Sequence, residues 1–155
     1  MLYATLKTLH LLAVVLWVGG MVFVLLFLRP ALDQLAPPER LKLMREVLRR
    51  FFTAVAVALV VLVGSGLWMV GRTARALAGS GAAFTWPPDW VAMTVLGIGM
   101  ALIFVFIRTV PYRRFVQALA GADLPAAAAA LGVIRRWVAV NAVLGVVVIA
   151  VAALF

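Results

Sequence analysis

This chain contains four long apolar stretches separated by short basic connections, and this pattern restricts it to few folds. Each stretch is long enough, at about 1.5 Å per helical residue, to cross the roughly 30 Å hydrocarbon core of a bilayer. The hydrophobic fraction is 67% and the charged fraction is 12%, whereas soluble domains are roughly half apolar and a quarter charged. A soluble fold of 155 residues could not bury so much apolar surface, so the surrounding solvent must be lipid.

The pattern predicts an all-α protein, in which one integral membrane domain spans residues 1–155 as an antiparallel bundle of four transmembrane helices. The first apolar stretch is longer than the core of a cleaved signal peptide, so we interpret it as a retained helix. Gly97 and Gly99 are expected where helices pack closely, as is the segment 64–66. The helices are expected at about 3–28, 38–70, 89–119 and 124–154.

The basic residues predict how the bundle is oriented. Eleven of the 14 Lys and Arg residues fall in the first and third connections, and three fall elsewhere. Because Lys and Arg accumulate on the cytoplasmic side, both termini are expected on the outer, periplasmic side of a bacterial inner membrane. Helices two and four should then carry long basic cytoplasmic extensions that attract anionic lipid. The net charge of +9 is therefore a topology signal and not evidence for nucleic-acid binding.

The single histidine, His10, lies inside the first apolar stretch. An ionisable side chain within a membrane span is costly to bury and is a candidate functional residue by default. The chain has no Cys, which excludes thiol chemistry, iron–sulfur clusters and Cys-based zinc sites. No Asp or Glu falls inside a span, which argues against a carboxylate relay or a hard-cation site there. His10 can thus be a metal or haem ligand, a hydrogen-bonded packing residue or a proton carrier.

The rise per residue also predicts which side chains share the depth of His10. Ser65 of the second helix and Thr94 of the third fall at nearly the same depth, in the outer half of the bilayer. Met69 and Met93 fall slightly further outward. The candidate site therefore combines an imidazole, two hydroxyl groups and two thioethers, and imidazole with thioether ligands suits Cu(I).

Two other residues of the first helix are further site candidates. Lys7 lies one turn before His10, where it is either an interfacial lysine or a substrate contact. Trp17 lies two turns after it. Asn141, in the fourth span, falls too far from His10 for a direct hydrogen bond and is expected to bond to another helix instead.

The opening run 6–20, with His10, Trp17 and a Gly-Gly pair, and the segment 27–32 that follows it resemble the small four-helix proteins of the copper-resistance protein D (CopD) family. The similarity continues through Pro37–Leu41, the Gly64–Leu67 run and Asn141. The resemblance implies an inner-membrane protein concerned with copper import or copper tolerance. The chain is not expected to be an enzyme on its own unless it binds haem.

The order of histidine, tryptophan and glycine in the first helix is also similar to that of the membrane-type (HemJ-like) protoporphyrinogen oxidases, which bind haem. Carried over by position, His10 would be an axial ligand of haem b, and the chain a membrane oxidoreductase. The oxidase pattern has a lysine early in the third helix, whereas Trp90–Thr94 contains none. A haem with two histidine ligands from one chain is excluded by the single histidine.

Three functions therefore stay open. The first is copper handling, with His10, Met69 and Met93 as ligands and copper ion bound in the outer half. The second is a haem b or porphyrin-binding redox protein that uses His10 alone or paired across a homodimer. The third is an accessory subunit of a larger membrane complex with no cofactor, in which His10 only packs.

Overall fold

The computed structural model describes residues 1–79 and 85–154. Within these residues no strand occurs, and four helical segments are long and apolar enough to cross a membrane. The predicted all-α class and the four candidate spanning helices are therefore confirmed. The four segments are Leu2–Leu32, Pro37–Gly79, Pro88–Ala120 and Leu124–Leu154.

The first segment is one continuous helix that is interrupted by two π-helical turns. π-helical turns are rare and shift the faces of a helix relative to one another. Trp17 and Val18, in the first of these turns, and Met21, just after it, are all buried in the core. The segment consists of α1 (Leu2–Val14), the π-turn η1 (Val15–Gly19), α2 (Gly20–Phe23), the π-turn η2 (Val24–Leu28) and α3 (Arg29–Leu32).

The second segment is α4 (Pro37–Gly79), which begins at a proline pair, and proline is favoured at the first positions of a helix. It extends beyond the predicted end at 70 by about two and a half turns, and this added segment contains Ala, Leu and Arg residues, which favour helix. Residues 80–84 of the connection that follows α4 lie outside the described residues.

The third segment differs from the single helix predicted at 89–119, since it is divided into α5 (Pro88–Thr109) and α6 (Pro111–Ala120). Pro111 has no amide hydrogen to donate to the preceding turn, and Val110 leaves the helical region with φ −110° and ψ −78°. The last segment, α7 (Leu124–Leu154), follows a tight turn in which Ala122 has a φ of 56°. The Asp123 carboxylate accepts a hydrogen bond from the Ala126 amide at 2.9 Å and caps the new helix.

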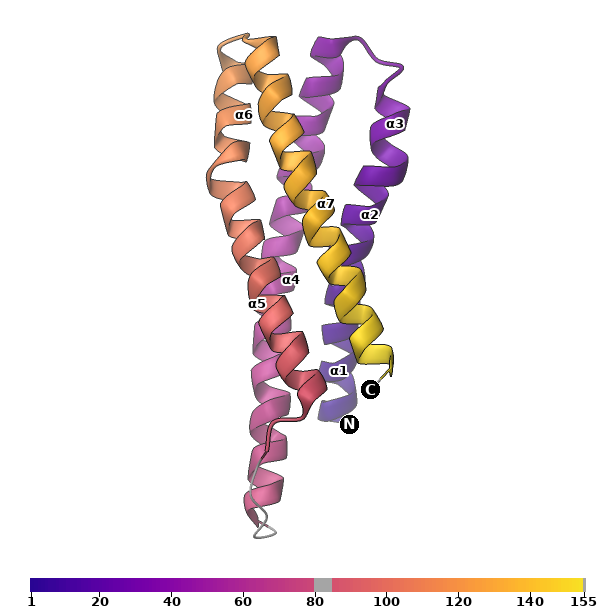
Figure 1. The fold of residues 1–155 in the computed structure, drawn as a ribbon, viewed down its shortest axis with the longest axis vertical. Helices are drawn as coiled ribbons and strands as arrows, with labels where there is room; N and C mark the ends of the chain where they lie inside the picture. Colours follow the sequence, from indigo (N-terminus) through magenta and orange to yellow (C-terminus); the bar gives the residue numbers. More distant parts are fainter. Residues whose placement is uncertain (80–84, 155) are drawn as a thin grey trace.

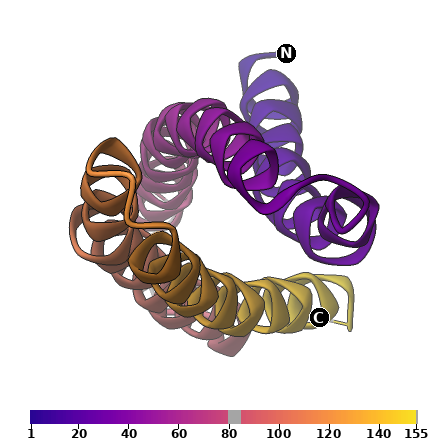
Figure 2. The same ribbon diagram turned by 90° about the horizontal axis from the view of Figure 1, so that it is seen from above.

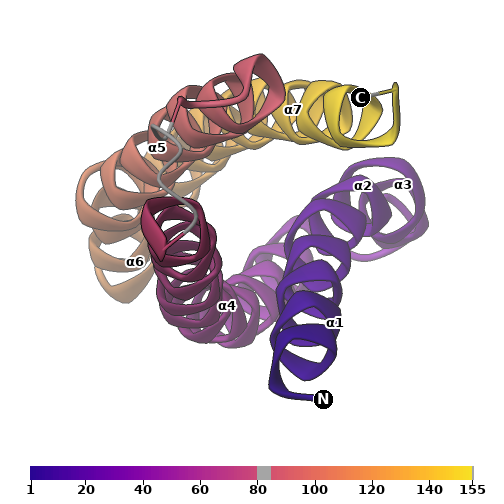
Figure 3. The same cartoon turned by 90° about the horizontal axis from the view of Figure 1, so that it is seen from below.

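The four segments alternate in direction (Figure 1). Both chain ends, the end of α4 and the start of α5 lie at one end of the bundle, which we call the terminal end. The α3–α4 and α6–α7 turns lie at the other, which we call the basic end because most of the Arg residues are near it. Seen along its length, the bundle is an arc with α1–α3 at one extremity and α7 at the other (Figures 2 and 3).

Buried side chains concentrate in the middle and in the basic half of the bundle. A chain of edge-to-face aromatic contacts runs through this core, with ring centroids 6.3 Å apart for Trp17 and Phe104 and 5.8 Å for Phe104 and Phe52. Phe52 also meets Tyr112 at 5.1 Å. These contacts join η1, α4, α5 and α6, and each adds about 0.5–1.5 kcal/mol beyond the area it buries.

The close helix contacts fall at other glycines than the two predicted on the third helix. A Cβ placed at Gly97 or Gly99 meets nothing within 4 Å, so the prediction for these two was wrong. At Gly145 of α7 it would lie 2.6 Å from a methyl group of Val18, and at Gly20 it would collide with the Phe51 ring. Helical periodicity alone does not say which glycine of a span faces a neighbour, because the rotation of each helix depends on tertiary packing.

Asn141 confirms the interhelical hydrogen bond predicted for it. Its side chain is 1% exposed, and its amide group donates to the Met100 carbonyl of α5 at 3.4 Å. Its Oδ1 atom is buried with no partner among the described residues. This asparagine therefore links α7 to α5 within the core.

Candidate functional site

His10 meets Ser65 between α1 and α4, at the terminal side of the buried core. The imidazole Nδ1 and the Ser65 hydroxyl oxygen are 2.8 Å apart. Helix α1 packs mainly on α4, and this packing places the two residues side by side. Ser65 is buried and His10 is half-buried, so the pair lies in the seam between the helices.

The hydrogen bonds of Ser65 assign the proton on the imidazole. Its hydroxyl donates to the Val61 carbonyl one turn earlier in α4, with the Leu62 carbonyl 3.3 Å away. A hydroxyl has one proton, so towards His10 the Ser65 oxygen can only accept. Nδ1 of His10 is therefore the protonated nitrogen and Nε2 keeps its lone pair, an assignment that follows from the network.

This arrangement is one that prepares a histidine to bind a metal. Ligating histidines usually donate their second ring N–H to a fixed acceptor, which sets the tautomer and the ring orientation. Here Ser65, itself anchored to the backbone of α4, is that acceptor. The same geometry also suits an imidazole that only ties α1 to α4, which was the packing interpretation of His10.

Gly66 leaves room beside the imidazole. A Cβ at this position would lie 3.7 Å from His10 Cε1, the carbon between the two ring nitrogens. That distance is an ordinary van der Waals contact, so alanine fits and a longer side chain would reach the edge of the ring. Of the Gly-Ser-Gly run in the second helix, Ser65 and Gly66 thus face His10, whereas a Cβ at Gly64 meets nothing within 4 Å.

The other residues predicted at the depth of His10 lie on two different helices. Met69, half-buried, follows Ser65 by one turn on α4. Met93, half-buried, and Thr94, exposed, belong to α5, which packs mainly on α7 and α6. Figure 3 shows α1 and α5 apart along the arc, with α4 between them. The structure therefore joins His10 directly to Ser65, and Met69 is the thioether on the helix that α1 contacts.

The two remaining candidates of the first helix have different surroundings. Trp17 is 5% exposed and stacks edge-to-face on Phe104 in the core. Lys7 is exposed. Trp17 thus takes part in core packing, and Lys7 lies on the surface of α1 near the terminal end.

A cluster that we did not predict lies beyond His10 towards the terminal end. The Arg72 guanidinium lies over the rings of Tyr3 and Trp68, at 5.4 Å and 5.6 Å from their centroids. Tyr3 and Trp68 are 6.5 Å apart. The signal was available, because Tyr3 precedes His10 by two turns while Trp68 and Arg72 follow Ser65 on one face of α4. This cluster fastens α1 to α4 next to the candidate site.

The donor set around His10 limits what it could hold. Among the described residues, no three His, Cys, Asp or Glu side chains lie close enough to share a metal ion. A site within one chain would therefore have to complete its ligands with thioether, hydroxyl or backbone groups. Such a set fits a soft ion such as Cu(I) better than a hard cation.

Comparison with known proteins identifies the family from the later helices. Residues 45–155 match the family model described as CopD, copper resistance protein D. The match covers over two thirds of the chain, includes Ser65 and Asn141, and begins after His10. No curated protein and no solved structure matches the chain.

Proposed function

Since the chain belongs to the copper resistance protein D family, we propose that it is a copper-handling protein in which His10 receives the ion. The observation that carries this proposal is the hydrogen bond between His10 and Ser65. It leaves the Nε2 lone pair of the imidazole available in a first segment whose other titratable side chains, Tyr3, Lys7 and Arg29, lie nearer its two ends. Copper is the cargo in this proposal, and its release requires that the site bind it reversibly.

Thioether groups complete the proposed site. Met69 is the first candidate because it lies on α4, the helix that α1 contacts. Met93, with Thr94 beside it, is the second, and its participation requires that α5 approach α1 or that a second copy supply it. Cu(I) accepts imidazole and thioether ligands in low coordination numbers, so two or three such groups suffice.

The proposed location is the bacterial inner membrane, with the basic end in the cytoplasm. This proposal rests on the excess of Lys and Arg at that end. The basic parts of α4 and α7 then face the anionic cytoplasmic leaflet, where each basic residue near the surface contributes about 1 kcal/mol of attraction. His10 lies in the outer half, on the side from which a periplasmic ion would enter.

The same lone pair supports a second candidate, a haem b protein that has His10 as axial ligand. In that case the chain would be a membrane oxidoreductase, and a homodimer would supply a second histidine. A His-ligated haem in a four-helix bundle is physically ordinary. When bound, haem supplies one-electron chemistry, and the role of this chain would be to orient the imidazole through Ser65.

One preparation separates these functions. The protein is purified in mild detergent, its visible absorption spectrum is recorded, and the same sample is assayed for copper. Stoichiometric copper without a Soret band supports copper handling, whereas a Soret band supports the haem function. A colourless, copper-free protein after incubation with Cu(I) contradicts both and leaves the accessory-subunit interpretation of the chain.

Variants identify the ligands. His10→Ala is expected to abolish the bound ion or haem while the protein stays folded and inserted. Met69→Leu and Met93→Leu remove a thioether at nearly constant volume, and Met44→Leu, in the core of the basic half, is the matched control. Copper that persists in His10→Ala at the original stoichiometry contradicts both ligand functions together.

A further inference from the structure

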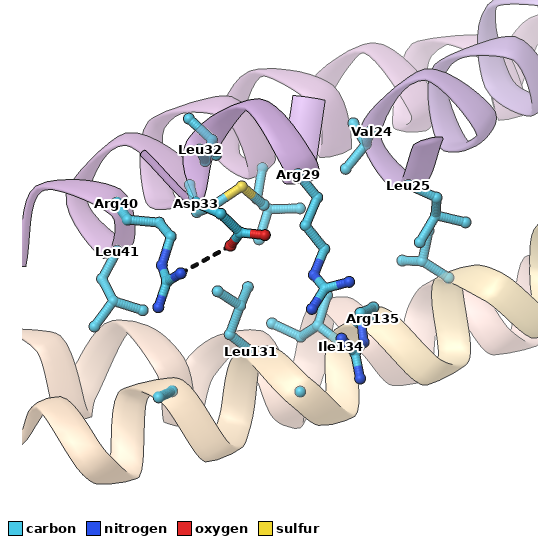
Figure 4. A pocket seen from close by; sticks show the side chains of 15 residues that line it. Val24, Leu25, Arg29, Leu32, Asp33, Arg40, Leu41, Leu131, Ile134 and Arg135 are labelled. Carbon is cyan, nitrogen blue, oxygen red and sulfur yellow. Dashed lines mark hydrogen bonds and ion pairs between the residues drawn. The ribbon is translucent and has the colours of Figure 1, made fainter. Parts of the chain in front are cut away.

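A cavity of about 310 Å³ lies at the basic end, between the first segment, the start of α4 and α7 (Figure 4). It is far from His10 and takes no part in the proposed copper site. Its volume is near the lower limit of small-molecule sites. Most of its walls are apolar, among them Val24, Leu25, Leu131, Ile134 and Val138.

Three arginines and one aspartate give the cavity a positive mouth. Arg40 donates to the Asp33 carboxylate at 2.9 Å, which neutralises one pair. Arg29 and Arg135 also line the cavity, and neither is among the ion pairs of the described residues. Figure 4 shows the Arg29 side chain reaching from α3 towards α7, with its guanidinium on the same side of the cavity as that of Arg135.

Two like charges that face one cavity repel each other unless an anion lies between them. Guanidinium groups bind phosphate through paired, charge-assisted hydrogen bonds, which are about twice as strong as neutral ones. The neighbouring walls are apolar and run deeper along the helices, since Val24 and Leu25 precede Arg29 by about one turn and Val138 follows Arg135 by three residues. The cavity is thus charged at its mouth and apolar inside.

We propose that this cavity binds an anionic phospholipid, with its phosphate between Arg29 and Arg135 and part of an acyl chain along the apolar wall. A phospholipid matches both halves of the cavity, whereas free phosphate would leave the apolar wall without a partner. Basic cavities between membrane helices on the cytoplasmic side are suited to such headgroups. The proposal is independent of copper and haem, and it uses the proposed orientation only to name the leaflet that supplies the lipid.

The experiment measures lipid binding to the detergent-purified protein by native mass spectrometry. The probe is dioleoylphosphatidylglycerol, dioleoylphosphatidylcholine tests the acyl chains without net charge, and inorganic phosphate tests the anion alone. Phosphatidylglycerol is expected to bind at least about tenfold more tightly than phosphatidylcholine, because the choline cation cancels the charge of the phosphate and is itself repelled by Arg29 and Arg135. Equal affinity for the two lipids would overturn the proposal, and so would displacement of phosphatidylglycerol by inorganic phosphate at a similar concentration.

Two double variants locate the site. Arg29→Gln with Arg135→Gln is expected to weaken phosphatidylglycerol binding by about tenfold or more. Arg113→Gln with Arg114→Gln removes the same charge from exposed residues of α6, outside the cavity. This double variant is expected to change the affinity for phosphatidylglycerol by less than about threefold. Equal losses in both would assign the binding to a diffuse basic surface and overturn the proposal.

A third variant tests the apolar half without changing any charge. Gly132 lines the cavity, and a Cβ there meets nothing within 4 Å, so Gly132→Leu fills the space and favours helix. We expect about a tenfold loss of phosphatidylglycerol affinity with unchanged helicity. Gly99→Leu on α5, also in open space, is the matched control. If the arginine variants fail to fold, Gly132→Leu alone tests the proposal, and unchanged binding of phosphatidylglycerol by Gly132→Leu overturns it.

Discussion

The Nδ1 atom of His10 lies 2.8 Å from the hydroxyl oxygen of Ser65, although the two residues are 55 positions apart in the chain. The same hydroxyl donates to the Val61 carbonyl within α4. One serine therefore does two things: it fixes the tautomer of the imidazole, and it joins α1 to α4 in the less densely packed half of the bundle. The first role affects ligand affinity and the second affects the free energy of unfolding, so the two can be measured separately.

Ser65→Ala should lower both ligand affinity and stability. Loss of the acceptor behind a ligating histidine typically costs about 10–100-fold in affinity, so the affinity for copper or haem should fall by that factor. Loss of the hydrogen bond should lower the free energy of unfolding by about 0.5–1.5 kcal/mol. Ligand titration and thermal unfolding in detergent measure the two effects.

The control for Ser65→Ala is Thr53→Ala, which removes a hydroxyl that also donates to a carbonyl one turn earlier in α4, but lies on an exposed face. It should leave ligand affinity unchanged. The double variant with His10→Ala completes a cycle. A coupling energy below about 0.3 kcal/mol would mean that the two side chains act independently, contrary to the structure.

Gly145→Ala should destabilise the bundle, because its Cβ would lie 2.6 Å from one methyl group of Val18 and 3.2 Å from Met100 Cε. Overpacking of this kind costs about 1–3 kcal/mol. Gly99→Ala, in open space on α5, should instead gain up to about 1 kcal/mol from helix propensity. Thermal unfolding of both variants in one detergent measures the difference.

Val18→Ala provides the rescue for the Gly145 variant. Removing the methyl groups of Val18 makes room for the added Cβ, so the double variant should be more stable than the sum of the two single changes predicts. If Gly145→Ala were as stable as Gly99→Ala, α7 could not pack on the first segment at Val18 as described.

Asn141→Leu should change stability by less than about 1 kcal/mol, since it removes both a long hydrogen bond of 3.4 Å and an acceptor that has no partner. Asn141→Asp should instead cost several kcal/mol, because it puts a charge in the same place. Unfolding curves for the pair test the packing role. A folded Asn141→Leu protein that no longer bound copper would show that this residue belongs to the functional site.

The number of spanning helices followed from the sequence because the length of each apolar stretch is a local property. Their ends were predicted less well. The extension of α4 to Gly79 depends partly on Arg72, which lies against Tyr3 and Trp68 in a contact between two helices. The break before α6 could have been read from Pro111, whose missing amide hydrogen is a local signal.

For the candidate site, the sequence predicted depth but not rotation. The estimate of 1.5 Å per residue put Ser65 at the level of His10, and the structure joins the two. The same estimate put Thr94 at that level, yet Thr94 lies on α5, which packs mainly on α7 and α6. Which helices become neighbours depends on the whole bundle. For the same reason, the cavity between Arg29 and Arg135 had no signal in either segment alone.

The orientation of the bundle can be tested directly because the chain has no cysteine. Leu35→Cys lies in the turn at the basic end, and Thr85→Cys precedes α5 at the terminal end; both positions are exposed. In intact spheroplasts a membrane-impermeant maleimide should label Thr85→Cys but reach Leu35→Cys only after lysis. The reverse pattern would move His10 to the inner half and turn Arg29 and Arg135 towards the outer leaflet. The direction of copper entry would then be reversed, whereas the lipid cavity would keep its chemistry and change only the leaflet that supplies it.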